Sequence, residues 1–113
     1  MKKTEAITEN YIFRRLYRRA KSAASPCLAM YCCRVKGRKY NRLGITATKK
    51  LGCAVKRNRA RRVIKEAYRL LEDEIPTGRD FVAVARQRAS AVKMQTVKEE
   101  LRGLIRKLER DNP

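Results

Sequence analysis

Apolar residues recur with helical spacing in three stretches of the chain. The first stretch predicts a helix over residues 9–20 that is capped by Thr8, and its apolar stripe consists of Phe13, Leu16, Tyr17 and Ala20. The second predicts a long helix over residues 54–73, with a core stripe of Ala60, Ile64, Ala67 and Leu71. A last amphipathic helix is marked by Val97, Leu101, Leu104, Ile105 and Leu108.

Between these helices the pattern becomes that of strands. Residues 27–35 and 42–48 read as strands, and residues 22–26 leave room for a short edge strand. Residues 81–85 are apolar on both faces, which predicts a central strand that is covered on both sides. This order indicates an α+β or α/β two-layer domain. We favour an α+β two-layer sandwich with the order αβββαβα, about four strands and a single domain, 1–113.

The charge of the chain is strongly basic and unevenly distributed. Lys and Arg number 30 against 11 Asp and Glu, which gives a formal net charge of +19. From residue 10 to residue 65 there is no acid, whereas this stretch holds eighteen Lys and Arg. A generic soluble protein interleaves the two signs, and a binder of polyanions concentrates one sign on one side. We therefore expect RNA or DNA as the partner, in preference to a membrane surface.

Missing residue types exclude several kinds of enzyme. The chain has no His, which removes Ser-His-Asp and Cys-His catalysis and His metal ligands. Its four cysteines form no C-x-x-C pair, and we interpret them as small buried hydrophobic residues in a reducing cytosol. The first ten residues lack the apolar stretch of a signal peptide, and no run is long enough to span a bilayer. These features predict a cytoplasmic protein that does not contact a membrane.

One candidate RNA-binding surface lies on the predicted second helix. Spacing of four places several cations along one side, where they repel each other until a phosphate backbone relieves the repulsion. Asn58 could contact a base edge or cap the helix, and the sequence leaves both possibilities open. The residues of this surface are Arg57, Asn58, Arg59, Arg61, Arg62, Lys65 and Arg69.

A second candidate surface combines aromatic rings with cations. Phe13, Tyr17 and Tyr31 could form a stacking platform for unpaired nucleotides if the first helix and the strand flank a groove. Arg14, Arg18 and Arg34 would lie beside this platform. The alternative is that Phe13 and Tyr17 are ordinary core residues, which the pattern alone favours.

Three segments resemble the bacterial ribonuclease P protein subunit. The most specific is the run from Leu43 to Arg69, in which Lys-Lys-Leu-Gly-Cys-Ala-Val precedes Lys-Arg-Asn-Arg-Ala-Arg-Arg. Phe13-Arg14-Arg15-Leu16-Tyr17 and Asp80-Phe81-Val82-Ala83-Val84-Ala85-Arg86 extend the resemblance in the family's order over nearly the whole chain. The sequence departs from the family at Cys53, where Asn is usual, at Ala20, where Gly is common, and at Thr46 and Thr48, which replace serines.

The resemblance implies an RNA-binding subunit of an endoribonuclease whose active site lies in a large catalytic RNA. That enzyme removes the 5′ leader of precursor tRNA and leaves a 5′-phosphate, with Mg²⁺ held by the RNA and the substrate. The resemblance also implies that the second-helix residues above bind the RNA subunit. It assigns leader binding to Phe13, Tyr17, Tyr31, Arg14, Arg18, Lys49 and Lys50.

The resemblance further implies a left-handed βαβ crossover and a need for no protein partner. A structural ribosomal or RNA-packaging protein is the alternative that composition alone favours. A nuclease that acts by itself is disfavoured, because the acids avoid the basic half of the chain.

Overall fold

The computed structural model describes residues 3–111, of which Asp111 is described in its backbone alone. The described residues form three helices, five strands and three short 3₁₀ turns, and β2, β3 and β4 follow one another between α1 and α2. The helices are α1 (Asn10–Arg19), α2 (Ala54–Leu71) and α3 (Met94–Asp111). The strands are β1 (Thr4–Ala6), β2 (Lys21–Ala24), β3 (Leu28–Arg34), β4 (Asn41–Thr46) and β5 (Arg79–Ala85). The turns are η1 (Lys49–Leu51), η2 (Glu72–Glu74) and η3 (Gln87–Ser90).

The strands form one mixed sheet in the order β1-β4-β5-β3-β2. The pairs β1–β4 and β4–β5 are parallel, and β5–β3 and β3–β2 are antiparallel. The α+β class is confirmed, but the sheet has five strands rather than about four, and the chain begins with a strand rather than a helix. The parallel β4-α2-β5 unit is the predicted crossover, and its left hand stays a prediction.

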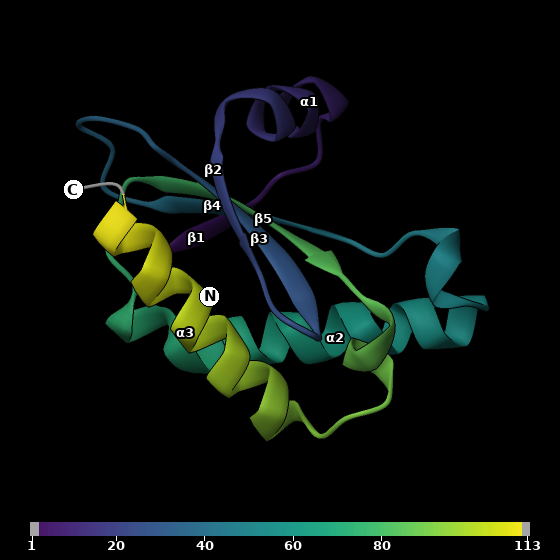
Figure 1. Cartoon of the computed structure of the whole chain (residues 1–113). Helices are drawn as coiled ribbons and strands as arrows, with labels where there is room; N and C mark the ends of the chain where they lie inside the picture. The colour runs from purple at the N-terminus through teal and green to yellow at the C-terminus, as the bar shows by residue number, and fades with distance from the viewer. Residues whose placement is uncertain (1–2, 112–113) are drawn as a thin grey trace.

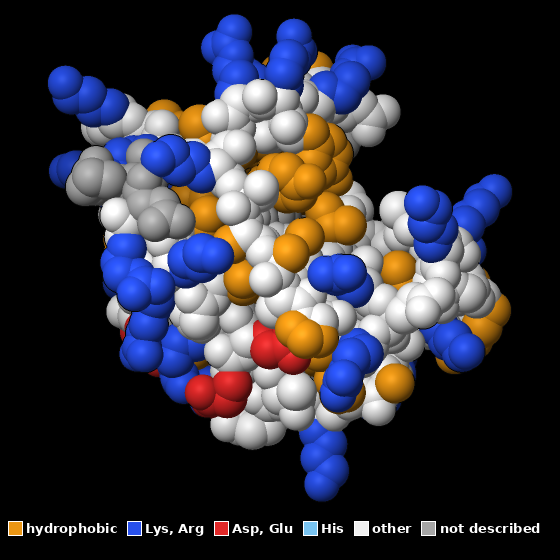
Figure 2. All heavy atoms as spheres, in the orientation of Figure 1, with side chains coloured by type: hydrophobic (Ala, Val, Ile, Leu, Met, Phe, Trp, Pro, Cys, Tyr) orange, Lys and Arg blue, Asp and Glu red, His pale blue; other side chains and the backbone are white. Residues whose placement is uncertain are grey.

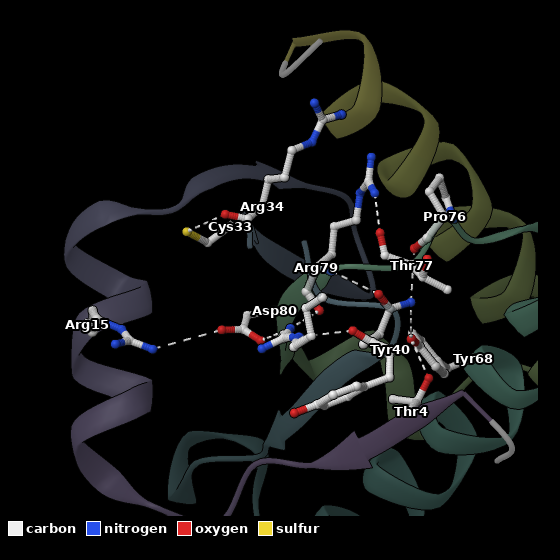
Figure 3. A network of polar contacts seen from close by, with 12 residues as sticks. Thr4, Arg15, Cys33, Arg34, Tyr40, Tyr68, Pro76, Thr77, Arg79 and Asp80 are labelled. Atoms are coloured by element: carbon white, nitrogen blue, oxygen red, sulfur yellow. Dashed lines mark hydrogen bonds and ion pairs between the residues drawn. The ribbon is translucent and has the colours of Figure 1, made fainter. Parts of the chain in front are cut away.

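The additional strand, β1, is held by side chains from the far end of α2 (Figure 3). Thr4 Oγ1 lies 3.0 Å from the Tyr68 hydroxyl and donates a hydrogen bond of 2.7 Å to Glu72. Both partners are buried and lie more than sixty residues away. Residues 4–6 have no repeating apolar pattern of their own, so local sequence carries no signal for this strand.

Helices cover both faces of the sheet, with α1 on one face and α2 and α3 on the other (Figure 1). The central strand β5 serves both sides, because its side chains alternate. Phe81 and Ala83 belong to the large core under α2 and α3, whereas Val82 packs with Ile12 and Leu16 of α1. The predicted double coverage of residues 81–85 is therefore confirmed, and α1 adds a partial third layer to the expected two.

The details of α1 differ from the prediction. Ile12 and Leu16 are its buried residues, while Phe13 is half-buried and the Tyr17 side chain is exposed. The predicted Thr8 cap is wrong, because the helix begins after Glu9 without a side-chain cap. Ile12 and Leu16 seat the helix on the sheet, and this leaves the two aromatic rings at its edge.

The cysteine interpretation holds for two residues and fails for one. Cys27 and Cys32 are buried, and burial raises the pKa of their thiols to about 11 and about 12. Cys33 is half-buried, whereas Cys53 is exposed just before α2 and does not pack in the core. The backbone N–H groups of the first turn of α2, with that of Lys56 foremost, lower the pKa of the Cys53 thiol. Among residues 3–111, no helix is long and apolar enough to cross a bilayer.

Candidate nucleic-acid interface

A groove opens between α1 and the sheet, and the Phe13 ring lies on its floor. The ring lies directly over Gly44 of β4, since a Cβ at this glycine would lie 2.5 Å from Phe13 Cε1. Only a residue without a side chain leaves room for the ring at this point. Gly44 is therefore a groove residue that sequence reasoning missed, although the Gly within an alternating strand was a signal for a close approach.

Two tyrosines extend the aromatic surface from Phe13 across the sheet. The Tyr17 and Tyr31 rings are 5.0 Å apart at their centroids and meet edge to face, at 81°. An open hollow of about 430 Å³ beside them is lined by Asn10, Phe13, Arg14, Tyr17 and Thr46. Figure 2 shows hydrophobic side chains gathered beneath α1, with Lys and Arg around them. The structure thus brings the three rings to one place, while their role as a stacking platform stays a prediction. The core alternative applies in part to Phe13 and Tyr31, which are half-buried against the α1 core, and not to the exposed Tyr17.

Of the three cations expected beside the rings, one lines the hollow, one is exposed on the same helix and one lies elsewhere. Arg14 lines the hollow, and Arg18 is exposed on the same helix. Arg34 does not belong to the platform as predicted, because it pairs with Glu109 of α3 at 3.8 Å.

A second hollow, of about 610 Å³, lies where the parallel strands β4 and β5 end. Lys50 lines it, and the neighbouring Lys49 is exposed in the same turn, η1. Val84 lines this hollow and also packs with the α1 core. Arg86, Gln87 and Arg88 also line the hollow, and the sequence analysis assigned them to no site. The Arg-x-Arg pair after the central strand was the available signal.

The basic side chains of α2 lie outside the stripe that packs on the sheet. Ala60, Ile64 and Ala67 form the buried side of the helix, as predicted. Six of the seven predicted residues are exposed, and only Arg57 is half-buried.

Several of these side chains have protein partners. Asn58 Oδ1 accepts a hydrogen bond of 3.1 Å from Arg61, so Asn58 does not cap the helix, which begins after Cys53. Arg59 donates to the Ser90 carbonyl at 3.0 Å and ties α2 to η3. Arg69 pairs with Glu66, and this hydrogen bond lowers the pKa of the Glu66 carboxyl.

The acids of the folded chain neutralise other parts of the molecule. Glu109 pairs with Arg79 at 2.8 Å, and Glu74 pairs with Arg102 and Arg106 of α3. Among the described residues, Arg69 is the one member of the predicted α2 surface that is paired with a carboxylate. Apart from Arg15 and Arg69, the cations of α1 and of the predicted α2 surface therefore form no ion pair within the described chain.

A buried polar network holds the sheet between these two surfaces (Figure 3). Asp80 is 2% exposed and pairs with Arg38, while Arg15 of α1 reaches the other carboxylate oxygen at 4.0 Å. Asn41 accepts a hydrogen bond from the Arg79 backbone at 2.9 Å and donates one to the Pro76 carbonyl at 3.0 Å. Asn41 and the Arg38–Asp80 pair thus tie the start of β4 to the start of β5, and Arg15 of α1 points to the same carboxylate.

A groove lined with rings and a separate, uncompensated basic helix on one small α+β domain define an RNA-binding protein. Comparisons with known proteins show to which family of RNA-binding proteins the chain belongs. A sequence model of the family described as Ribonuclease P matches residues 1–109. The Clostridioides difficile ribonuclease P protein component is 35% identical over 93% of this chain and 92% of its own length. Its counterpart in Thermoanaerobacter sp. is 38% identical over 94% and 90%.

Solved structures agree with this assignment. The Staphylococcus aureus RNase P protein superposes with a TM-score of 0.79 at 32% identity, over 89% of this chain and 92% of that chain. The Thermotoga maritima RNase P protein gives 0.80 at 28% identity, over 91% and 96%. The chain belongs to the ribonuclease P protein family, whose members are the protein component of a tRNA-processing ribonucleoprotein. The expected family is thus confirmed, and a ribosomal or packaging role has no support.

Proposed function

We propose that the two surfaces divide the work of the holoenzyme. The α2 surface binds the catalytic RNA subunit, and the groove under α1 binds the single-stranded 5′ leader of precursor tRNA. The RNA carries the active site, and cleavage leaves a 5′-phosphate on the mature tRNA. The observation that carries this proposal is that the two surfaces lie on opposite faces of one rigid sheet. Two different RNA chains can therefore be held at once.

The groove suits an unpaired strand. The Phe13 ring and the Tyr17–Tyr31 pair offer faces and edges on which successive bases can stack without sequence readout. Arg14 and Arg18 lie where they can neutralise phosphates of the same strand. Lys49 and Lys50 stand farther along, at the second hollow, and would position the backbone close to the cleavage point.

The protein itself contributes binding and orientation. Several of its carboxylates pair with arginines, as in the Asp80–Arg38 and Glu109–Arg79 pairs. Among residues 3–111, no three Cys, Asp or Glu side chains gather in a way that could hold a metal ion. Mg²⁺ held by the RNA and the substrate would supply the activated water and stabilise the leaving oxygen.

Leader binding is tested by comparing precursor and mature tRNA. In the reconstituted holoenzyme, Phe13→Ala or Tyr17→Ala should weaken precursor binding by about 1–3 kcal/mol for each stacked base that is released. Mature tRNA, which has no leader, should bind as before. Tyr11→Ala is the matched control, because Tyr11 is an exposed ring of the same helix that does not line the groove. Equal losses of affinity for both tRNAs would contradict the assignment of the groove.

RNA-subunit binding is tested by its salt dependence. Arg62→Gln or Lys65→Gln should reduce the slope of log K against log salt by about 0.7–0.9 for each phosphate that the variant no longer neutralises. Lys107→Gln removes the same charge from the exposed side of α3 and should leave the slope unchanged. A wild-type slope in both Arg62→Gln and Lys65→Gln would mean that the α2 surface does not contact the RNA.

A further inference from the structure

A third cavity, apart from the leader groove, lies between strand β1 and helix α2. Its volume is about 290 Å³, at the small end of the range for ligand sites. Its floor is apolar and consists of Ala6, Ile7, Leu43 and Ile45. Its rim is cationic and consists of Arg61, Arg62 and Lys65. Strand β1, tied to Tyr68 and Glu72 at its start, forms one wall.

The combination of floor and rim is unusual for a site that binds only phosphate. A phosphate group gains nothing from a floor of aliphatic side chains, and a purely apolar ligand gains nothing from three cations. An unpaired nucleotide offers both parts, since its base is flat and apolar on its faces and its flanking phosphates are anionic. The cavity has room for one base and is too small for a duplex.

The cations are arranged to receive such a nucleotide. Arg61 is held by two neutral acceptors, the Asn58 side chain at 3.1 Å and the Ala47 carbonyl at 3.4 Å. Its guanidinium plane is therefore pre-positioned, and Arg planes stack on bases. Arg62 and Lys65 form no ion pair within residues 3–111 and remain available to phosphates.

We propose that this cavity receives one unpaired base of the catalytic RNA subunit, which makes it the nucleotide-recognising part of the α2 surface. The inference rests on the proposed function, because it assumes that α2 faces the RNA subunit. It adds a contact with a particular nucleotide to a surface that otherwise reads only phosphates. Strand β1 is essential to it, since without β1 the cavity has no second wall.

The test fills the cavity without changing any charge. Ala6 is exposed in β1, so Ala6→Trp and the milder Ala6→Leu place their side chains in the cavity with little demand on the core. Ala24→Trp is the matched control, because Ala24 is exposed in β2, the opposite outer strand of the sheet. Thermal melts of all three variants confirm that they are folded before binding is measured.

The proposal predicts that Ala6→Trp weakens binding of the RNA subunit about tenfold, which is about 1.4 kcal/mol. The salt slope should be that of wild type, because every cation that neutralises a phosphate is still present. Mapping of 2′-hydroxyl reactivity on the RNA should show the change confined to one or two adjacent nucleotides. Ala6→Leu should give a smaller change at the same nucleotides, and Ala24→Trp should give none.

Two results would overturn the proposal. One is wild-type affinity and an unchanged reactivity map in both folded Ala6 variants. The other is a change in reactivity spread over the whole protein footprint, which would indicate a displaced α2 rather than a filled cavity. Failure of the proposed function looks different, because the wild-type protein itself would then not bind the RNA subunit.

Discussion

Substitution of Gly44 by Ala tests whether the Phe13 ring lies directly over this position of β4. The added Cβ would lie 2.5 Å from Phe13 Cε1 and 2.6 Å from Cζ, whereas non-bonded carbons are at rest at about 3.5–4.0 Å. The ring therefore has to move by roughly 1 Å or more. It borders an open hollow, so it can turn outward instead of displacing the backbone.

This geometry predicts a loss of stability and a loss of affinity for precursor tRNA. Overpacking costs about 1–3 kcal/mol of stability, and the open side of the ring places Gly44→Ala at the lower end, at about 1 kcal/mol. A ring displaced from its position over Gly44 also ceases to offer the same surface to the leader. Precursor tRNA should then bind about 1–3 kcal/mol more weakly, while mature tRNA binds as in wild type.

A double-mutant cycle with Phe13→Ala provides the assay, with urea unfolding for stability and the two tRNAs for binding. In the Phe13→Ala background, Gly44→Ala should cost almost nothing. The next atom that the new Cβ meets is Ile7 Cβ, at an ordinary contact distance of 3.4 Å. If Gly44→Ala destabilises both backgrounds equally, the ring does not lie over this glycine and the description of the groove floor is wrong.

Two further predictions concern residues outside the groove. Cys53 should be the first cysteine to react with iodoacetamide. Because its pKa is lowered, its labelling rate should begin to rise at a lower pH than that of an ordinary thiol. Mass spectrometry should show that Cys27 and Cys32 stay unlabelled until the protein unfolds. Labelling of Cys27 at the rate of Cys53 would contradict its burial. Tyr68→Phe removes the hydroxyl that contacts Thr4 and should lower the free energy of unfolding by about 1 kcal/mol in urea titrations. An unchanged unfolding midpoint would mean that this contact does not secure β1.

Much of the fold could be predicted because each long element carries its own period. Helix α2 buries Ala60, Ile64 and Leu71, as the spacing indicates, and β5 is apolar on both faces because helices cover both. Strand β1 could not be predicted. Thr4 of this strand contacts Tyr68 and Glu72, which lie more than sixty residues later. A local sequence pattern cannot indicate contacts between residues so far apart in the chain.

The sequence predicted which kinds of residue form the candidate site better than it predicted where their side chains lie. Phe13 and Tyr17 do lie at a groove, but the stripe that contains them does not distinguish a buried ring from a ring at an edge. The burial of Ile12 on the sheet side of α1 decides this in the folded chain. Arg34 was misplaced for a similar reason, because its acidic partner, Glu109, lies seventy-five positions later in the sequence.

Because successive side chains of β5 point to opposite faces of the sheet, this one strand supports both proposed binding surfaces. Phe81 and Ala83 support the helix that we assign to the RNA subunit, and Val82 supports the helix that borders the leader groove. A slip of a single residue would exchange these roles and turn each apolar side chain toward the wrong layer. An inserted residue within 79–85 would thus damage both surfaces together, whereas a lengthened hairpin after β3 would leave β5 in register.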